Sequence, residues 1–141
     1  KTSNFSSGDV QDRVTADEKM SVAELMGHFV ESWGSDSLGE QGYSSVGAVV
    51  GATFPAQAAK LRKIMPTSIF LVPGYGSQGG TVEDVKPCFN EDGLGALIVN
   101  ARGIIFAFSK DGEVGTGENF ADAARSATVK MNVEISPLLP V

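Results

Sequence analysis

Hydrophobic residues follow two different spacings along this chain, and the two spacings alternate. Between residues 22 and 33 apolar side chains recur every three or four positions, which is the period of an amphipathic helix. Residues 46–50, 68–72 and 96–100 are instead short, nearly continuous apolar runs, as in strands that are buried on both faces of a parallel sheet. The alternation predicts an α/β architecture.

Residues that favour a helix start stand between the apolar runs. Ser21 and Glu24 have the spacing of a capping box, and Thr81 can cap a short helix. Thr53 and Pro55 mark another start, because threonine can cap free backbone N–H groups and proline tolerates the first helical turn. The predicted helices cover residues 22–33, 53–65, 81–89 and about 118–134.

The order of these elements agrees with two α/β shapes. Residues 1 to about 19 are rich in Ser, Asp and Gly and predict a long loop, after which three strand-then-helix units follow. Such units form a parallel sheet covered by helices. Both an open doubly wound sheet and part of an eight-stranded barrel have units of about this length. Strand spacing alone leaves the two shapes open.

Composition narrows the classes of function. The 141 residues are 42% hydrophobic and 20% charged, which is the profile of one ordinary globular domain. The single cysteine and single histidine exclude an internal disulfide and a four-ligand Cys/His zinc site. A net charge of −6 disfavours nucleic acid or an anionic membrane surface as the partner. Because no apolar run approaches the roughly 18 residues of a membrane span, we expect a cytoplasmic protein.

Two polar loops that follow apolar strands have the chemistry of an anion site. Residues 73–80 contain four glycines, which let the backbone approach a ligand and point N–H groups at it, with the Gln78 amide among them. Residues 100–103 place Arg102 where a strand ends and a short helix begins. Free N–H groups and a fork-shaped guanidinium suit a dianionic phosphate.

The position of the loops supports this interpretation. In barrels, the loops after the last two strands commonly form a phosphate site with a short extra helix, and these loops follow the last two predicted strands. A glycine-rich loop is by itself often only a turn, and an arginine after a strand is often part of a surface ion pair. Their occurrence at consecutive strand ends favours the phosphate site.

At these residues the sequence resembles orotidine 5'-monophosphate decarboxylase, in particular the longer-chain bacterial branch of that family. The stretch Pro-Gly-x-Gly-x-Gln-Gly-Gly followed by a later arginine is the most specific part, and the resemblance covers nearly the whole chain. It implies that residues 1–141 are the C-terminal half of a single (β/α)8 TIM barrel, made of its last strands and helices. The matching motifs are Thr2-Ser3-Asn4 and residues 46–53, 70–80 and 100–104.

The resemblance also implies site residues and a reaction. Gln78 would contact the substrate phosphate from a mobile loop, Arg102 would hold that phosphate, and the Ala101 amide would add a donor. Ser3 would hydrogen-bond the pyrimidine, and Pro73 would line the pocket. The implied reaction is the conversion of orotidine monophosphate to uridine monophosphate and carbon dioxide in pyrimidine biosynthesis, with no metal and no organic cofactor.

The catalytic cluster of that family has no counterpart in this chain. The family carries its Lys and Asp residues in a D-x-K-x-x-D motif; Asp84 and Lys86 begin like it, but Phe89 takes the second Asp position. Smaller departures are Phe5 and Ala101, where related sequences tend to have Pro and Ser. We therefore expect no catalytic residue in this chain and no activity without the N-terminal half of the barrel.

The resemblance implies three partners: a small nucleotide substrate, the N-terminal half of the same barrel, and a second copy in a homodimer. Two other functions also agree with a phosphate-binding site. One is another phosphate-binding barrel enzyme, which only the pyrimidine contact of Ser3 distinguishes from the decarboxylase. The other is a noncatalytic nucleotide- or phosphate-binding module, complete as an open α/β domain.

Four further residues have plainer interpretations. His28, the lone histidine, is predicted to be a partly exposed helix residue away from the strand ends. Cys88 has no adjacent base to activate it and is predicted to be a small packing residue. Phe29 and Trp33 are at helical spacing and are predicted to lie in the core. None of the four is assigned a role in binding or catalysis.

Overall fold

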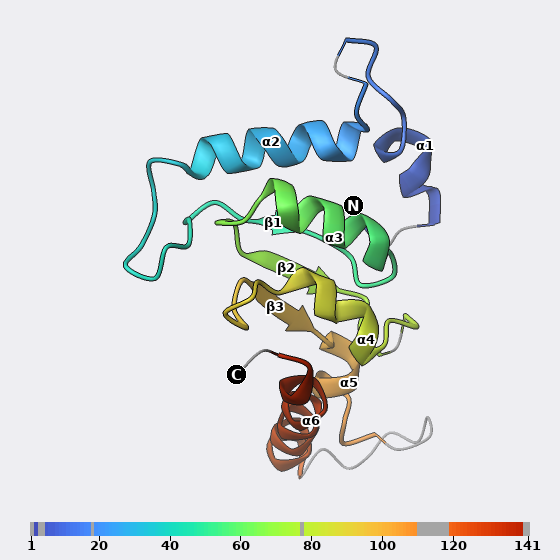
Figure 1. Cartoon of the computed structure of the whole chain (residues 1–141). Helices are drawn as coiled ribbons and strands as arrows, with labels where there is room; N and C mark the ends of the chain where they lie inside the picture. Colours follow the sequence, from blue (N-terminus) through green and yellow to red (C-terminus); the bar gives the residue numbers. More distant parts are fainter. Residues whose placement is uncertain (1, 3–4, 18, 77, 110–118, 140–141) are drawn as a thin grey trace.

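A computed structural model describes residues 2, 5–17, 19–76, 78–109 and 119–139 of the chain (Figure 1). The helices are α1 (Gly8–Gln11), α2 (Val22–Gly34), α3 (Pro55–Ile64), α4 (Val82–Val85), α5 (Ala101–Ile105) and α6 (Phe120–Ile135). The strands are β1 (Ala48–Val49), β2 (Phe70–Pro73) and β3 (Ala96–Val99). Short 3-10 segments cover Phe5–Ser7, Lys86–Cys88 and Ser136–Leu138.

The three strands form one parallel sheet in the order β1-β2-β3, so each strand lies beside the next one along the chain. Helix α3 connects β1 to β2, and α4 lies between β2 and β3 in the sequence. Figure 1 shows the elements following one another through the molecule, from α2 at one end to α6 at the other. The predicted α/β architecture with a parallel sheet is confirmed.

The two faces of the sheet differ in what covers them. Phe70 and Val72 of β2 are fully buried in the core that the helices cover. Val49, Leu71 and Leu97 pair across neighbouring strands and are 48%, 43% and 60% exposed, so they form an open apolar row. Side chains alternate between the faces of a strand, and the described helices cover only one face. The prediction of strands buried on both faces is therefore wrong for the described part of the chain.

Helix α2 begins as predicted. The Ser21 hydroxyl accepts a hydrogen bond from the Glu24 amide at 3.2 Å, and the Glu24 carboxylate accepts one from the Ser21 amide at 2.7 Å, which completes the capping box. Gly27 is buried against α3, because a Cβ at this position would lie only 3.2 Å from Ile64 Cγ2. This close approach determines which side of α2 faces the rest of the molecule.

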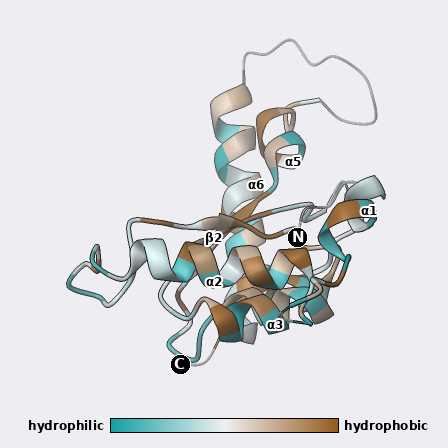
Figure 2. Ribbon diagram, turned by 90° about the horizontal axis from the view of Figure 1, so that it is seen from above, coloured by the Kyte–Doolittle hydropathy of each residue, from teal (hydrophilic) through white to brown (hydrophobic). Residues whose placement is uncertain are grey.

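The aromatic residues of α2 lie on a different side of the helix. Phe29 is 45% exposed and Trp33 is 61% exposed, and their rings stack with centroids 5.9 Å apart. Their predicted place in the core is therefore wrong, since the helix turns Gly27 and not this pair toward α3. Figure 2 shows hydrophobic and hydrophilic segments alternating along α2. His28 is exposed, in agreement with its predicted place on the helix surface.

The start of α3 differs from the prediction. Pro55 is the first helical residue, as its fixed backbone angle allows, but the N-cap is Phe54 and no side chain caps the helix. The Thr53 hydroxyl oxygen is instead buried without a hydrogen-bond partner among the described residues. Threonine stands one position too early to reach the free N–H groups of the first turn.

The segments at the two ends also refine the predictions. The predicted loop before α2 contains a 3-10 turn, Phe5–Ser7, and the short helix α1, Gly8–Gln11. Helix α6 runs over Phe120–Ile135, and the start predicted near residue 118 lies outside the described residues. Within the described ranges, no helix is both long enough and apolar enough to cross a membrane.

A buried guanidinium on α3 ties together segments at the amino-terminal end of the sheet. Arg62 is 7% exposed and lies 3.6 Å above the ring of Phe70. Burial lowers the pKa of this guanidinium, and carbonyl dipoles offset the loss of water around the charge. Arg62 donates hydrogen bonds of 2.7–3.0 Å to the carbonyl oxygens of Met65, Ser68, Cys88 and Gly95.

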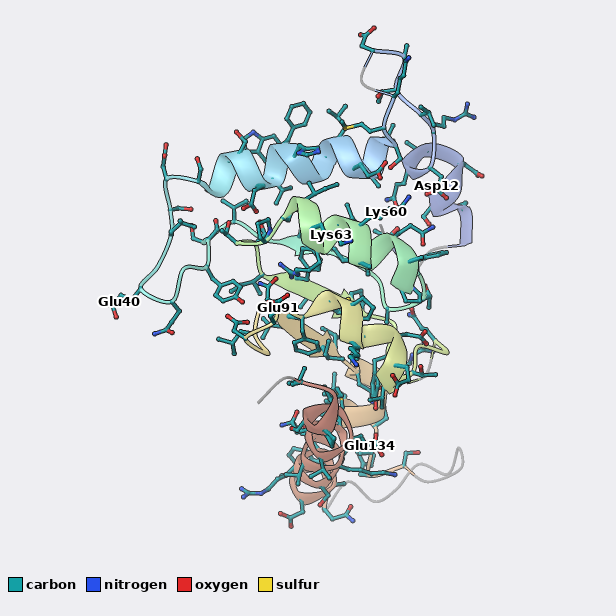
Figure 3. The ribbon with its side chains drawn as sticks, viewed as in Figure 1. Asp12, Glu40, Lys60, Lys63, Glu91 and Glu134 are labelled. Carbon is teal, nitrogen blue, oxygen red and sulfur yellow. The ribbon has the colours of Figure 1, made fainter. Side chains whose placement is uncertain are left out.

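We expect Arg62→Met to lower the free energy of unfolding by roughly 3 kcal/mol or more, because buried carbonyls lose their donors. Lys63→Met is the matched control, since Lys63 is the next cation on α3 and is exposed (Figure 3). Urea unfolding followed by circular dichroism measures both variants. An equal, small loss in the two variants would contradict a structural role for the Arg62 hydrogen bonds.

Candidate functional site

The carboxyl ends of β2 and β3 carry the two loops that the sequence singles out. Strand β2 ends at Pro73 and is followed by residues 74–80, and β3 ends at Val99 and is followed by Asn100 and α5. Because the strands are parallel and Pro73 pairs with Val99, both loops leave the same edge of the sheet. Parallel α/β proteins place their ligand sites at this edge.

The glycine-rich loop is closed by its own backbone. The Gly76 N–H donates to the Gly80 carbonyl at 2.8 Å, and the Gly80 N–H donates to the Gly74 carbonyl at 3.0 Å. Gly74, Gly76 and Gly79 have φ values of 102°, 70° and 90°, a region that residues with a Cβ rarely adopt. The turn back of the chain therefore depends on glycine at these three positions.

The second loop continues directly into a short capped helix. The Asn100 side-chain oxygen accepts a hydrogen bond from the Gly103 N–H at 3.2 Å and so caps α5. Arg102 is the second residue of α5 and is exposed. A Cβ on Gly76 would lie 3.4 Å from the Asn100 side-chain nitrogen, so the two loops are in contact.

Four of the predicted site residues gather around one pocket between these loops. Pro73 and Gln78 come from the first loop, and Ala101 and Arg102 come from α5. Ser3, the predicted pyrimidine contact, lies outside the described residues. The pocket is lined by Pro73, Gly74, Tyr75, Gln78, Val99, Ala101 and Arg102.

The side chains around this pocket suit an anionic ligand. Arg102 offers a planar fork of N–H donors, and Gln78 offers an amide N–H₂ group. None of the lining residues is acidic. A group with several negatively charged oxygens, such as a phosphate, matches these donors in number and in charge. The arrangement can therefore bind and orient an anion.

Sequence reasoning missed a side-chain pair that joins the pocket lining to α6. Tyr75 is 7% exposed, and its hydroxyl donates to Oε2 of Glu134 on α6 at 2.9 Å. Burial, and then the hydrogen bond to Glu134, raises the pKa of Tyr75 above its ordinary value. The two residues are 59 positions apart, so no local spacing in the sequence indicates the pair.

Asp84, which begins like the catalytic motif that the resemblance implies, caps a helix instead. The Asp84 carboxylate accepts hydrogen bonds from the Thr81 amide at 2.9 Å and from the Thr81 hydroxyl at 2.7 Å, which caps α4. These hydrogen bonds lower the pKa of Asp84.

Among the described residues, no three metal-ligating side chains of the His, Cys, Asp and Glu types come together.

The chain is similar to curated orotidine 5'-phosphate decarboxylases. The protein from Rhodopirellula baltica is 44% identical over 140 residues, which covers 96% of this chain and 45% of the relative. The protein from Caldicellulosiruptor bescii is 45% identical over 108 residues, which covers 77% of this chain and 35% of the relative. The chain thus spans less than half the length of these relatives. No protein-family model matches it.

Solved structures show the same likeness. Leishmania donovani UMP synthase superposes with a TM-score of 0.73 at 33% identity, covering 98% of this chain and 26% of that one. Leishmania donovani OMP decarboxylase superposes with a TM-score of 0.69 at 29% identity, covering 98% of this chain and 45% of that one. The open parallel sheet is therefore part of a TIM barrel and not a doubly wound sheet. The predicted resemblance to the C-terminal half of a decarboxylase is confirmed.

We expect Cys88 to react slowly with thiol reagents. It is fully buried, and burial raises the pKa of its thiol to about 11. At pH 8 about one such thiol in a thousand is then ionised, and the thiolate is the reactive form. A disulfide reagent at pH 8 should modify Cys88 in urea and leave it unmodified over the same time in buffer. Equal rates in the two solutions would contradict the burial of this side chain.

We expect Gly80→Ala to distort the glycine-rich loop, because the added Cβ would lie 2.6 Å from the Gly74 carbonyl oxygen and 2.9 Å from Ala52 Cβ. Overpacking of this kind typically costs about 1–3 kcal/mol. Urea unfolding followed by circular dichroism should therefore show a free energy of unfolding that is lower by about 1–3 kcal/mol in this variant. Gly39→Ala is the control, since its Cβ would make only an ordinary contact of 3.6 Å.

Proposed function

We propose that this chain, which matches orotidine 5'-phosphate decarboxylases along nearly its whole length, forms the phosphate-binding end of such an enzyme. The complete enzyme would convert orotidine monophosphate to uridine monophosphate and carbon dioxide. The observation that carries the proposal is the pocket that Gln78 and Arg102 both line at the carboxyl ends of adjacent strands. Homologues of 44% and 45% identity carry the decarboxylase name.

The two loops would make different contacts with the phosphate. Arg102 would take two phosphate oxygens with its guanidinium, and the Ala101 amide would add a backbone donor. Gln78 would approach from the glycine-rich loop, while Pro73 would form the wall of the pocket. Ser3 would hydrogen-bond the pyrimidine ring at the other end of the nucleotide. This division follows the donors around the pocket and the roles that the resemblance implies.

Phosphate binding would contribute to the rate as well as to affinity. The phosphate is remote from the carboxylate that leaves, so its contacts can be used to close the site and to exclude water around the ring. The chain itself carries no completed D-x-K-x-x-D motif. We therefore propose that the Lys and Asp residues that act on the carboxylate come from the N-terminal half of the barrel.

The open face of the sheet supports this partner. Val49, Leu71 and Leu97 form an exposed apolar row, and the interior of an eight-stranded barrel is filled by inward-pointing side chains of this kind. Strands of an N-terminal half on the opposite side of the barrel would cover the row. The resemblance further implies a homodimer of complete barrels, which we propose on that ground alone.

The proposal is tested by assembling the barrel. The chain would be produced alone and joined to an N-terminal half, for example that of the Rhodopirellula baltica relative. The intact mass and decarboxylation of orotidine monophosphate would be measured on each sample. We expect turnover only from the joined protein. Binding of uridine monophosphate without turnover in a joined, folded protein would overturn the enzyme assignment and favour a noncatalytic nucleotide-binding module.

We expect Arg102→Ala in the complete barrel to lower kcat/KM for orotidine monophosphate about tenfold or more. Each charge-assisted hydrogen bond contributes roughly 1.5–3 kcal/mol, and the variant removes the whole guanidinium. Steady-state kinetics measures the loss. Arg125→Ala is the matched control, because Arg125 is an exposed arginine on α6 that does not line the pocket. Unchanged kinetics for Arg102→Ala would remove Arg102 from the phosphate site.

A further inference from the structure

Helix α6 contacts both segments that form the pocket. It packs directly against α5, which carries Arg102. Figure 3 labels Glu134 on this helix. The Glu134 carboxylate accepts a hydrogen bond from the Tyr75 hydroxyl, so α6 also reaches the glycine-rich loop. Neither residue was among the site residues implied by the resemblance. Helix α6 thus has a contact with each of the two segments.

Tyr75 is placed where a single anchor can position the whole loop. It is the second residue after β2, and it forms a parallel bridge with Gly80 at the far end of the loop. The Gly76–Gly80 and Gly80–Gly74 backbone hydrogen bonds close the segment between them. A restraint on Tyr75 is therefore passed to both ends of the loop that carries Gln78.

The hydroxyl of Tyr75 has a feature that packing alone does not explain. Its ring belongs to the same buried cluster as Met131 and Ile135 of α6, and a phenylalanine would fill that place equally well. The hydroxyl instead donates at 2.9 Å to an ionisable carboxylate, and a hydrogen bond to a charged group is stronger than one between neutral groups. The raised pKa of Tyr75 agrees with a hydroxyl that stays protonated as the donor.

We infer that the Tyr75–Glu134 hydrogen bond is a positioning contact, through which the last helix holds the base of the phosphate loop while Gln78 binds substrate. The inference rests on the proposed function of the pocket and adds two residues to it. Tyr75 and Glu134 act through the loop and take no part in the bond that breaks. Their effect should therefore depend on the presence of a phosphate on the substrate.

The test compares two substrates in the complete barrel. Tyr75→Phe keeps the ring and removes the hydroxyl, Glu134→Ala removes the acceptor, and Glu134→Gln keeps an oxygen that can accept the hydrogen bond. We expect the first two variants to lower kcat/KM for orotidine monophosphate about tenfold and to leave kcat/KM for orotidine, which lacks the phosphate, unchanged. Glu134→Gln should retain most of the kcat/KM for orotidine monophosphate that Glu134→Ala loses.

A second tyrosine–carboxylate pair supplies the control. The Tyr43 hydroxyl donates to both Asp92 oxygens at 2.9 Å, away from the pocket, so Tyr43→Phe should leave both substrates unaffected. Thermal unfolding of every variant shows whether stability has changed. If Tyr75→Phe does not fold, the comparison of Glu134→Ala with Glu134→Gln decides, because Glu134 lies at the helix surface with its side chain 41% exposed.

Two results would overturn the inference. One is a kcat/KM for orotidine monophosphate within twofold of the unmodified protein in both Tyr75→Phe and Glu134→Ala. The other is an equal loss for orotidine and its monophosphate, which indicates a general structural role. In either case a tenfold loss in Arg102→Ala would leave the proposed function standing. An inactive unmodified barrel would instead reject the proposed function itself.

Discussion

Parallel pairing of β2 with a strand on each side is the constraint on which the rest of the structure depends. The register places Phe70 toward the helices and Leu71 on the open face, and a shift by one residue would exchange them. The same register sets Pro73 level with Val99, so the glycine-rich loop and α5 begin side by side. Core, open face and pocket are therefore determined together.

The parts of the fold that depend on local spacing could be predicted from the sequence. The capping box of α2, the apolar runs of β2 and β3, and the turn-forming glycines act within a few residues. The errors concern neighbours in space. Helical spacing places Phe29 and Trp33 on one apolar side of α2, but it does not determine which side of the helix contacts α3. The close approach of Gly27 to α3 determines that side.

The two loops of the candidate site could be predicted, because the order of the parallel strands alone brings them together. Consecutive parallel strands end at one edge, so two chemically suitable loops in sequence become one pocket in space. Tyr75 and Glu134 could not be found in this way, because their contact joins a loop to a helix surface 59 residues later. The Arg62 hydrogen bonds were missed for the same reason. An arginine on a helix is normally expected to be exposed to solvent, and only the structure shows that Arg62 is buried.

The two ends of the sheet are held by different chemistry, and this separates stability from binding. At the amino-terminal end a buried guanidinium takes up carbonyl oxygens that would otherwise lack donors. At the carboxyl end the glycine-rich loop is closed by hydrogen bonds within its own backbone, and Arg102 is exposed at the pocket. In the proposed function, phosphate contacts would draw in the tip of the glycine-rich loop while its base stays in place. The Tyr75–Glu134 hydrogen bond would hold that base, because Tyr75 also bridges to Gly80 at the far end of the loop.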